Sequence, residues 1–194
     1  MTARKLVSMF RRGGYAFSTN QQGVSAVEFA LLLPLMLTMY FGCIEVTDAV
    51  SADRQVALVA STVADITAQY QTVTTGDVAN ILAAASAVLA PFSAANAKVT
   101  LSSVVIDANL NATVDWSRAT ANGTPRAQGS SVTSAIPAAL RVANTSTIWG
   151  EATYAYKPLI GWVVTGTLNL SNQMFMRPRL AKCVQYTGVS TLCP

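Results

Sequence analysis

Residues 24–44 form the longest apolar run of the chain, and Glu28 is the single charged residue within it. A helix needs about 20 apolar residues to cross the hydrocarbon core of a bilayer. The run is therefore predicted to be a membrane-spanning helix. A carboxylate in such a helix either lies at the membrane interface or has a partner, and the run by itself leaves both interpretations of Glu28 open.

The segments on either side of this run predict its orientation and its length. Residues 1–23 contain four basic residues and no acid, which is the positive-inside pattern and places the N-terminus in the cytoplasm. After the run, apolar side chains recur every three or four positions through residues 45–70, which predicts an amphipathic continuation of the same helix. One helix over residues 24–70 would be about 70 Å long. The alternative is two helices with a bend near residues 47–53.

The remaining sequence changes from helical to alternating patterns. A second short helix is predicted to begin at Gly76-Asp77, with Asp77 as its cap, and to end before Pro91. Alternation of apolar and polar residues then predicts four strands, at residues 98–107, 112–118, 148–156 and 168–176. We expect an α+β fold in which these strands form one antiparallel sheet, with the long helix on one face and polar side chains on the other. Residues 119–134 are rich in Gly, Ser, Thr and Asn and are predicted to form a mobile surface loop.

The charge distribution argues against a nucleic-acid partner. The chain has 13 basic and 9 acidic residues and a net charge of +4. Because four of the basic residues lie in the N-terminal segment and all the acids lie after it, the rest of the chain is neutral. Only 11% of the residues are charged, which suits an extracytoplasmic polymer subunit better than a cytosolic enzyme.

The residues that carry enzyme chemistry are scarce. The sequence contains no His, which excludes Ser-His-Asp and Cys-His catalytic arrangements and His-based metal sites. It also lacks the glycine patterns that bind phosphates or dinucleotides. Asp107 and Asp115 could in principle act as an acid and a base, but we interpret them as residues of a solvated sheet edge. We therefore predict no catalytic residue, no metal and no cofactor.

A basic leader, Gly23, Val24, then Glu28, Phe29 and a long apolar run resemble the prepilin peptidase signal of the type IV pilin superfamily. The Glu-Phe form is that of the tight-adherence (Tad, or Flp) pilus system. Within it, the whole chain is most similar to TadE-like minor pseudopilins. The stretch from Trp149 to Leu159, Trp-Gly-Glu-Ala-Thr-Tyr-Ala-Tyr-Lys-Pro-Leu, and the later Met-Arg-Pro-Arg at 176–179 extend the resemblance.

The resemblance implies a pilin-like fold and a set of roles for the N-terminal residues. A membrane aspartyl protease, the prepilin peptidase, would cut between Gly23 and Val24, with Phe29 as part of its recognition signal. A glycine before the cut would give the protease an unhindered, extended backbone. The carboxylate of Glu28 would then pair with the new amine of its own or a neighbouring subunit and set the register of assembly.

The resemblance also implies a location, partners and a domain organisation. The chain would have a leader (residues 1–23), a transmembrane helix (24–44), its amphipathic continuation (45–70) and an extracytoplasmic domain (71–194). It would cross the bacterial inner membrane once, with its C-terminal domain in the periplasm or, in an assembled pilus, outside the cell. Its partners would be other pilin and pseudopilin subunits, bound through the N-terminal helix, together with the inner-membrane assembly platform and membrane lipid. Its function would be pilus assembly and surface adherence, as in biofilms.

A periplasmic destination bears on the three cysteines. Cys183 and Cys193 lie in a polar tail, where an oxidising compartment favours a disulfide that pins the C-terminus. The alternative is two free thiols in a frayed tail. Cys43 lies in the apolar run, and we interpret it as an inert small residue.

Two other classes of protein fit parts of the pattern. A secreted enzyme or binding protein would have a signal peptide that ends near residues 50–52, but Glu45 and Asp48 lie between the apolar core and that site. An uncleaved, membrane-anchored TadG-like structural protein or adhesin would keep residues 1–23. The N-terminus of the mature chain distinguishes all three.

Overall fold

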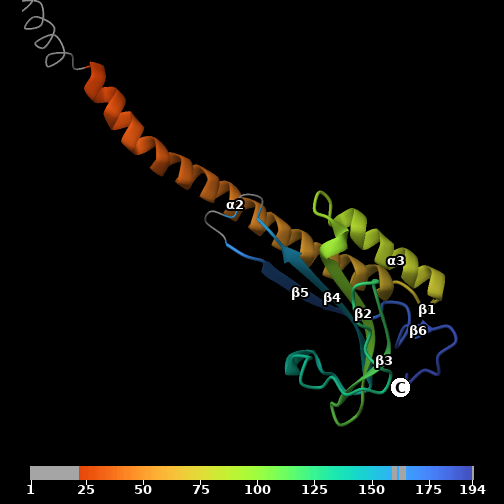
Figure 1. Cartoon of the computed structure of the whole chain (residues 1–194). Helices are drawn as coiled ribbons and strands as arrows, with labels where there is room; N and C mark the ends of the chain where they lie inside the picture. The colour runs from red at the N-terminus through yellow and green to blue at the C-terminus, as the bar shows by residue number, and fades with distance from the viewer. Residues whose placement is uncertain (1–21, 159–160, 162–164, 194) are drawn as a thin grey trace, which may run out of the picture.

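The computed structural model describes residues 22–158, 161 and 165–193, and one long helix dominates it. Helix α2 runs from Gln22 to Ala68, 47 residues, and continues through Pro34 without a break. The prediction of one continuous helix is confirmed, and the alternative of two helices is wrong. The N-terminal half of α2 extends away from the rest of the molecule, whereas its C-terminal half lies across a β-sheet (Figure 1).

Four strands form the sheet, in the order β3-β2-β4-β5 with every neighbouring pair antiparallel. Their bounds are Ala97–Ile106 (β2), Ala112–Ala119 (β3), Thr145–Tyr156 (β4) and Leu168–Met176 (β5). Each predicted strand is present within a few residues, because alternation over seven or more positions is a strong signal for a half-buried strand. The predicted α+β fold, a long helix on a four-stranded antiparallel sheet, is confirmed.

The main core lies between α2 and the inner face of the sheet. Val56, Val59 and Val63 of α2 are buried there with Leu101 of β2 and Ile148 of β4. Helix α3, Thr75–Val88, packs beside α2 on the same face of the sheet and adds Val78, Ile81 and Ala85 to this core. Burial of this apolar face, rather than helix propensity, orders the C-terminal half of α2.

The start of α3 differs from the prediction. Thr74, not Asp77, is the N-cap, and its hydroxyl accepts a hydrogen bond from the Asp77 backbone amide. Asp77 stands three residues later and accepts from the Thr74 backbone amide, which completes a capping box. Hydrogen bonds from Thr74 lower the pKa of the Asp77 carboxyl. The helix ends at Val88, three residues before Pro91.

We expected polar side chains on the outer face of the sheet, but part of this face is apolar. Val104, Ile106, Val114 and Trp149 form a second apolar cluster there, and Val132 and Ile136 of the β3–β4 connection cover it. The surface loop predicted over residues 119–134 is present, but it is attached to the sheet. Composition favoured a mobile loop, whereas Val132 within this range and Ile136 just after it pack on the sheet.

Short elements complete the fold and were not predicted. Two 3₁₀ turns span Ala94–Asn96 (η1) and Ala138–Leu140 (η2). Strand β1, Thr72–Val73, follows α2 and pairs in parallel with β6, Gln185–Tyr186, near the C-terminus. Two-residue strands have no periodicity that a sequence pattern could reveal.

Candidate functional site

The residues of the proposed processing signal lie in the first turns of α2. Gly23, Val24, Glu28 and Phe29 are all exposed helical residues. The peptide bond between Gly23 and Val24 is thus in the first helical turn rather than in the extended backbone that we expected. The first four amides of a helix have no intrahelical acceptor, so this turn is the one that unwinds most readily.

No packing requirement explains the glycine at position 23. A Cβ atom built on Gly23 would meet nothing within 4 Å, and its backbone does not need a positive φ. Gly150, at the centre of β4, is the opposite case, since a Cβ there would lie 2.4 Å from the carbonyl oxygen of Ala60. The described fold therefore does not require a glycine at position 23, whereas it does require one at position 150.

Glu28 lies one helical turn after Val24, about 6 Å along the helix axis. Its side chain is exposed. Every residue from Val24 to Ala30 is also exposed, so the other described residues do not cover this end of the helix. Among the described residues, none forms an ion pair with the Glu28 carboxylate.

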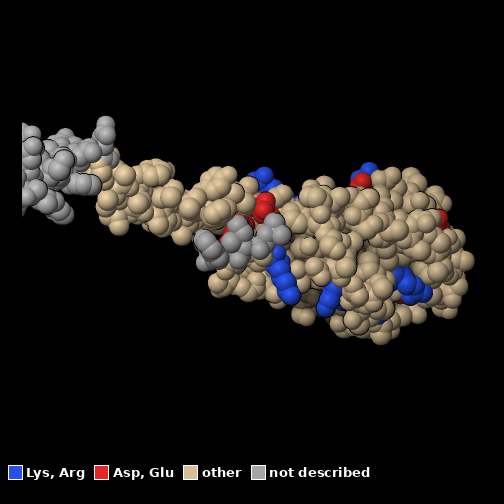
Figure 2. All heavy atoms as spheres, turned by 45° about the horizontal axis from the view of Figure 1, so that its top comes forward, with Lys and Arg blue, Asp and Glu red and all other residues tan. Residues whose placement is uncertain are grey.

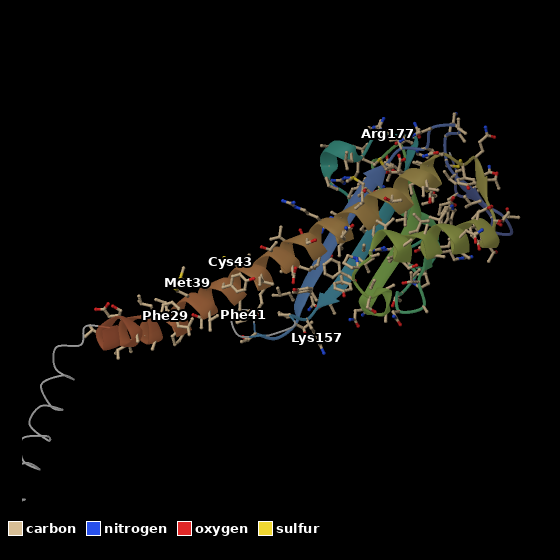
Figure 3. All side chains as sticks on the ribbon, turned by 90° about the horizontal axis from the view of Figure 1, so that it is seen from above. Phe29, Met39, Phe41, Cys43, Lys157 and Arg177 are labelled. Carbon is tan, nitrogen blue, oxygen red and sulfur yellow. A yellow bond between two sulfur atoms is a disulfide. The ribbon has the colours of Figure 1, made fainter. Side chains whose placement is uncertain are left out.

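The free half of α2 is apolar on all sides. Leu31, Leu32 and Leu33 follow one another about 100° apart around the helix and are 74%, 55% and 38% exposed. Figure 3 shows Phe29 and Met39 projecting from this half with no sheet or second helix beside them, whereas Lys157 lies where the domain begins. A helix that is hydrophobic all round requires a membrane or other helices to cover it.

Helix α2 is long and apolar enough to cross a membrane, judged by its length and composition. On the face shown in Figure 2, the free half of the helix has no charged side chain, and the first charges appear where it joins the domain. Gly42 and Glu45 are the first buried residues of the helix, so the domain begins to cover it there. One N-terminal apolar helix of this kind is consistent with a membrane anchor.

The carboxylates considered as a catalytic pair have separate structural roles. Asp107 accepts hydrogen bonds from the backbone amides of Asn109 and Asn111 and from the Asn111 side chain, which closes the β2–β3 turn. The bonds from Asn111 lower the pKa of Asp107. Asp115 is buried rather than at a solvated edge, and it accepts hydrogen bonds from Thr191 and Leu192 of the C-terminal tail. The expectation of a solvated edge is therefore wrong for Asp115.

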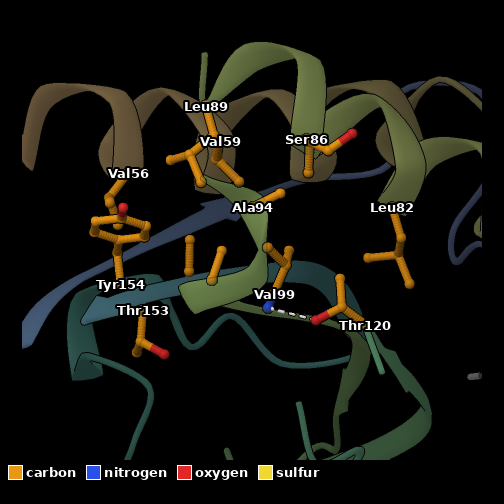
Figure 4. A pocket seen from close by; sticks show the side chains of 13 residues that line it. Val56, Val59, Leu82, Ser86, Leu89, Ala94, Val99, Thr120, Thr153 and Tyr154 are labelled. Carbon is orange, nitrogen blue, oxygen red and sulfur yellow. Dashed lines mark hydrogen bonds between the residues drawn. The ribbon is translucent and has the colours of Figure 1, made fainter. Parts of the chain in front are cut away.

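A small cavity lies between α2, α3 and the inner face of the sheet (Figure 4). Val56, Val59, Leu82 and Val99 are among the mostly apolar side chains that line it, and its volume is about 40 Å³. Pockets for small-molecule ligands have volumes of about 300–1,000 Å³. The cavity is thus a packing gap in the core. No group of three or more potential metal ligands occurs in the described part of the chain.

The two cysteines of the tail, Cys183 and Cys193, are joined by a disulfide, with their Cα atoms 6.0 Å apart. Cys183 is buried beside the end of the sheet. Cys43 is a free, exposed thiol on the apolar half of α2.

The comparison with known protein families gives a match within helix α2. Residues 23–65 match the model of the TadE-like protein family. This segment is TadE-like. A search of curated proteins and of solved structures found no match to the chain.

The TadE-like segment coincides with the helix and not with the sheet domain. It begins at Gly23, before the proposed cleavage point, and ends at Asp65, three residues before α2 ends. The predicted resemblance to TadE-like proteins is confirmed for this segment, which indicates a protein associated with Tad pili. The 149–159 and 176–179 stretches lie outside the match, so that part of the resemblance stays a prediction.

Proposed function

We propose that the chain is a minor pseudopilin of a Tad-type pilus, a structural subunit that contributes to pilus biogenesis and surface adherence. The observation that carries this proposal is the TadE-like segment itself. It folds as one helix whose first half is exposed and apolar all round and whose second half is packed on a sheet domain. A subunit held to its neighbours through such a helix needs no catalytic site.

Processing would occur after Gly23, by a prepilin peptidase, with residues 1–23 as the leader and Phe29 as part of the signal. The open space around Gly23 supports this, because the fold itself does not require a glycine there. Removal of the basic leader would leave residues 24–44 in the inner membrane and residues 71–194 in the periplasm, joined by the amphipathic helix of residues 45–70. The positive charge of the leader supports an N-terminus in the cytoplasm before cleavage.

Assembly would then depend on helix contacts and on one ion pair. Small residues of the free half, such as Ser25, Ala26 and Ala30, allow pilin helices to approach closely within the membrane. The carboxylate of Glu28 would pair with the amine of Val24, of its own or a neighbouring subunit, because two separate charges in lipid cost more free energy than one pair. The remaining partners are the assembly platform and membrane lipid.

The N-terminus of the mature protein tests this function. The full chain is expressed in cells with and without a prepilin peptidase, and its intact mass and N-terminal sequence are measured after membrane extraction. We expect a start at Val24 only where the peptidase is present. The Gly23→Val variant should keep its leader while folding normally, since no neighbour contacts that position.

Other N-termini would contradict the proposal. A start at Met1 in the presence of an active peptidase would favour a permanently anchored protein. A start near Asp53 would favour a secreted one.

Replacement of Glu28 tests the ion pair separately from cleavage. Glu28→Ala should be processed at Val24 but should be recovered with isolated pili or assembly complexes at a copy number at least several-fold lower. Glu28→Asp, which keeps the charge, should retain part of the incorporation. Normal copy number of Glu28→Ala would exclude a role of the pair in assembly.

A further inference from the structure

Hydrogen bonds join the C-terminal tail, residues 182–193, to the sheet near each of the two cysteines of its disulfide. Close to Cys183, the indole Nε1 of Trp116 donates to the Val184 carbonyl at 2.7 Å. The Ser146 hydroxyl donates to the Lys182 carbonyl at 2.7 Å. Both strand residues are buried, so the tail supplies acceptors to donors that solvent does not reach.

At the other end, the tail supplies donors to a buried carboxylate. Asp115 is 1% exposed. Its Oδ1 accepts from the Leu192 backbone amide at 2.6 Å, and its Oδ2 accepts from the Thr191 hydroxyl at 3.3 Å. Leu192 immediately precedes Cys193, so the disulfide holds these donors over the carboxylate. Loss of the hydrogen-bond donors to a buried carboxylate strongly destabilises the folded state.

Between the two cysteines, the tail reaches the connection of α2 and α3. Strand β6 pairs with β1, and the amides of Gln185 and Thr187 donate to the carbonyls of Gln71 and Val73 at 3.0 Å each. Val184 and Tyr186 are buried in the main core. The tail thus links three parts of the domain that are distant in sequence: β1, β3 and the start of β4.

We propose that oxidation of Cys183 and Cys193 and docking of the tail on β3 are one coupled step that completes the domain. Two thiols and an external disulfide, RSSR, exchange to give the Cys183–Cys193 disulfide and two RSH. The two electrons and two protons pass to the external disulfide, which is therefore the oxidant. The reaction that precedes completion of this domain is thiol–disulfide exchange with a disulfide oxidant, a protein or a small molecule, in a compartment that maintains one.

Coupling of this kind is reciprocal. If the docked tail favours the disulfide by some factor, the disulfide favours docking by the same factor. Removing a contact on β3 must therefore make the disulfide easier to reduce, although neither sulfur atom is changed. A disulfide that only closes a small exposed loop would not respond to the contacts of Asp115 or Trp116. The proposal goes beyond the pilus role and does not depend on cleavage after Gly23.

The redox equilibrium of the full chain tests the coupling. The protein in detergent is equilibrated with glutathione at graded ratios of thiol to disulfide, free thiols are alkylated, and the oxidised fraction is measured by intact mass. We expect Asp115→Ala to shift the equilibrium constant toward the dithiol by about tenfold, since it removes hydrogen bonds to a charged group. Asp107→Ala is the matched control and should not shift it, because the hydrogen bonds found for Asp107 lie within its own turn.

A second variant and the reciprocal measurement complete the test. Trp116→Phe keeps an aromatic ring in the core but removes the Nε1 donor, so it should shift the equilibrium in the same direction even if Asp115→Ala does not fold. Cys193→Ser should make residues 184–192 accessible to a protease in an otherwise folded chain. If Trp116→Phe has the wild-type equilibrium constant and Cys193→Ser keeps a protected tail, docking and oxidation are independent and the proposal is wrong.

Discussion

At the scale of single residues, the structure shows a position where packing within the fold requires one particular residue type. At Gly150 of β4, a Cβ atom would come within 2.4 Å of the Ala60 carbonyl oxygen and 3.0 Å of the Ala64 Cβ atom. These neighbours belong to α2, so the glycine is what lets the long helix lie directly on the strand. On either side of it, Trp149 and Glu151 point to the outer face of the sheet.

We therefore predict that Gly150→Ala destabilises the domain. Helix backbone cannot move aside as a flexible side chain would, and overpacking of this kind costs about 1–3 kcal/mol. The free energy of unfolding of the full chain in detergent would show it in a denaturant titration. Gly76→Ala is the control: its new Cβ would lie 3.7 Å from the Thr74 hydroxyl, an ordinary contact, so its stability should be nearly unchanged. Equal stabilities of the two variants would contradict this account.

Among the elements, the connection between β3 and β4 differs most from what its composition predicted, which was a mobile surface loop. Its residues 129–132 hydrogen-bond to β3: Gly129 and Val132 donate to the carbonyls of Val114 and Ala112. The connection thereby covers the free edge of β3, which would otherwise be open to unwanted strand pairing. Earlier in the connection, the guanidinium of Arg126 pairs with Glu151 of β4 through two hydrogen bonds.

Arg126 fixes this connection over the outer face of the sheet. Its guanidinium lies 3.9 Å from the centre of the Trp149 ring, and that ring stacks on Phe175 with centroids 5.4 Å apart. The Arg126 and Glu151 side chains are 28% and 24% exposed, so solvent screens the pair only partly. The ion pair and the stacked cation act together on one segment.

Loss of this contact should release the connection without unfolding the sheet. We expect Arg126→Ala to raise the rate of subtilisin cleavage within residues 119–131 several-fold and to lower stability by about 1 kcal/mol. Cleavage sites would be identified by mass spectrometry. Arg54→Ala is a suitable control, because Arg54 is exposed on α2 and has no ion pair with another described residue. Unchanged cleavage in Arg126→Ala would show that residues 129–136 alone hold the connection.

At the scale of the whole molecule, the long helix belongs to two environments. Its first half has exposed apolar side chains all round, and its second half supplies buried residues to the core from Ala52 onward. The change takes place near Glu45, which is 2% exposed, and Asp48. Burial, and then the negative charges of Asp48 and Glu45, raise the pKa of Tyr156 at the end of β4, so the domain lies against the helix at this level.

This division predicts that the domain can be separated from its anchor. A chain that begins at Glu45 should be monomeric in buffer without detergent and should keep the thermal unfolding midpoint of the full chain within a few degrees. It retains every buried residue of the core but loses the exposed apolar helix. Size-exclusion chromatography and circular dichroism would test this, with the full chain, expected to aggregate without detergent, as the comparison. Aggregation of the shortened chain would mean that the free half of α2 also stabilises the domain.

Local pattern was enough to predict the long helix, the second helix and the four strands. Hydrophobic periodicity repeats over many residues in each of them, and the apolar run at residues 24–44 is independent of any tertiary contact. The Gly23, Glu28 and Phe29 pattern likewise pointed to the TadE-like segment because it is contiguous in sequence. These features depend on neighbours along the chain.

Only the tertiary structure decided which distant residues meet. The pairing of β1 with β6, the burial of Asp115 beneath the tail and the contact of Gly150 with α2 each join segments far apart in sequence. The polar composition of residues 119–134 did not predict the contacts of Arg126, because the position of one charge in the sequence does not indicate which residue it will pair with. Periodicity identifies the face of an element that is buried, but what covers that face depends on how the whole chain packs.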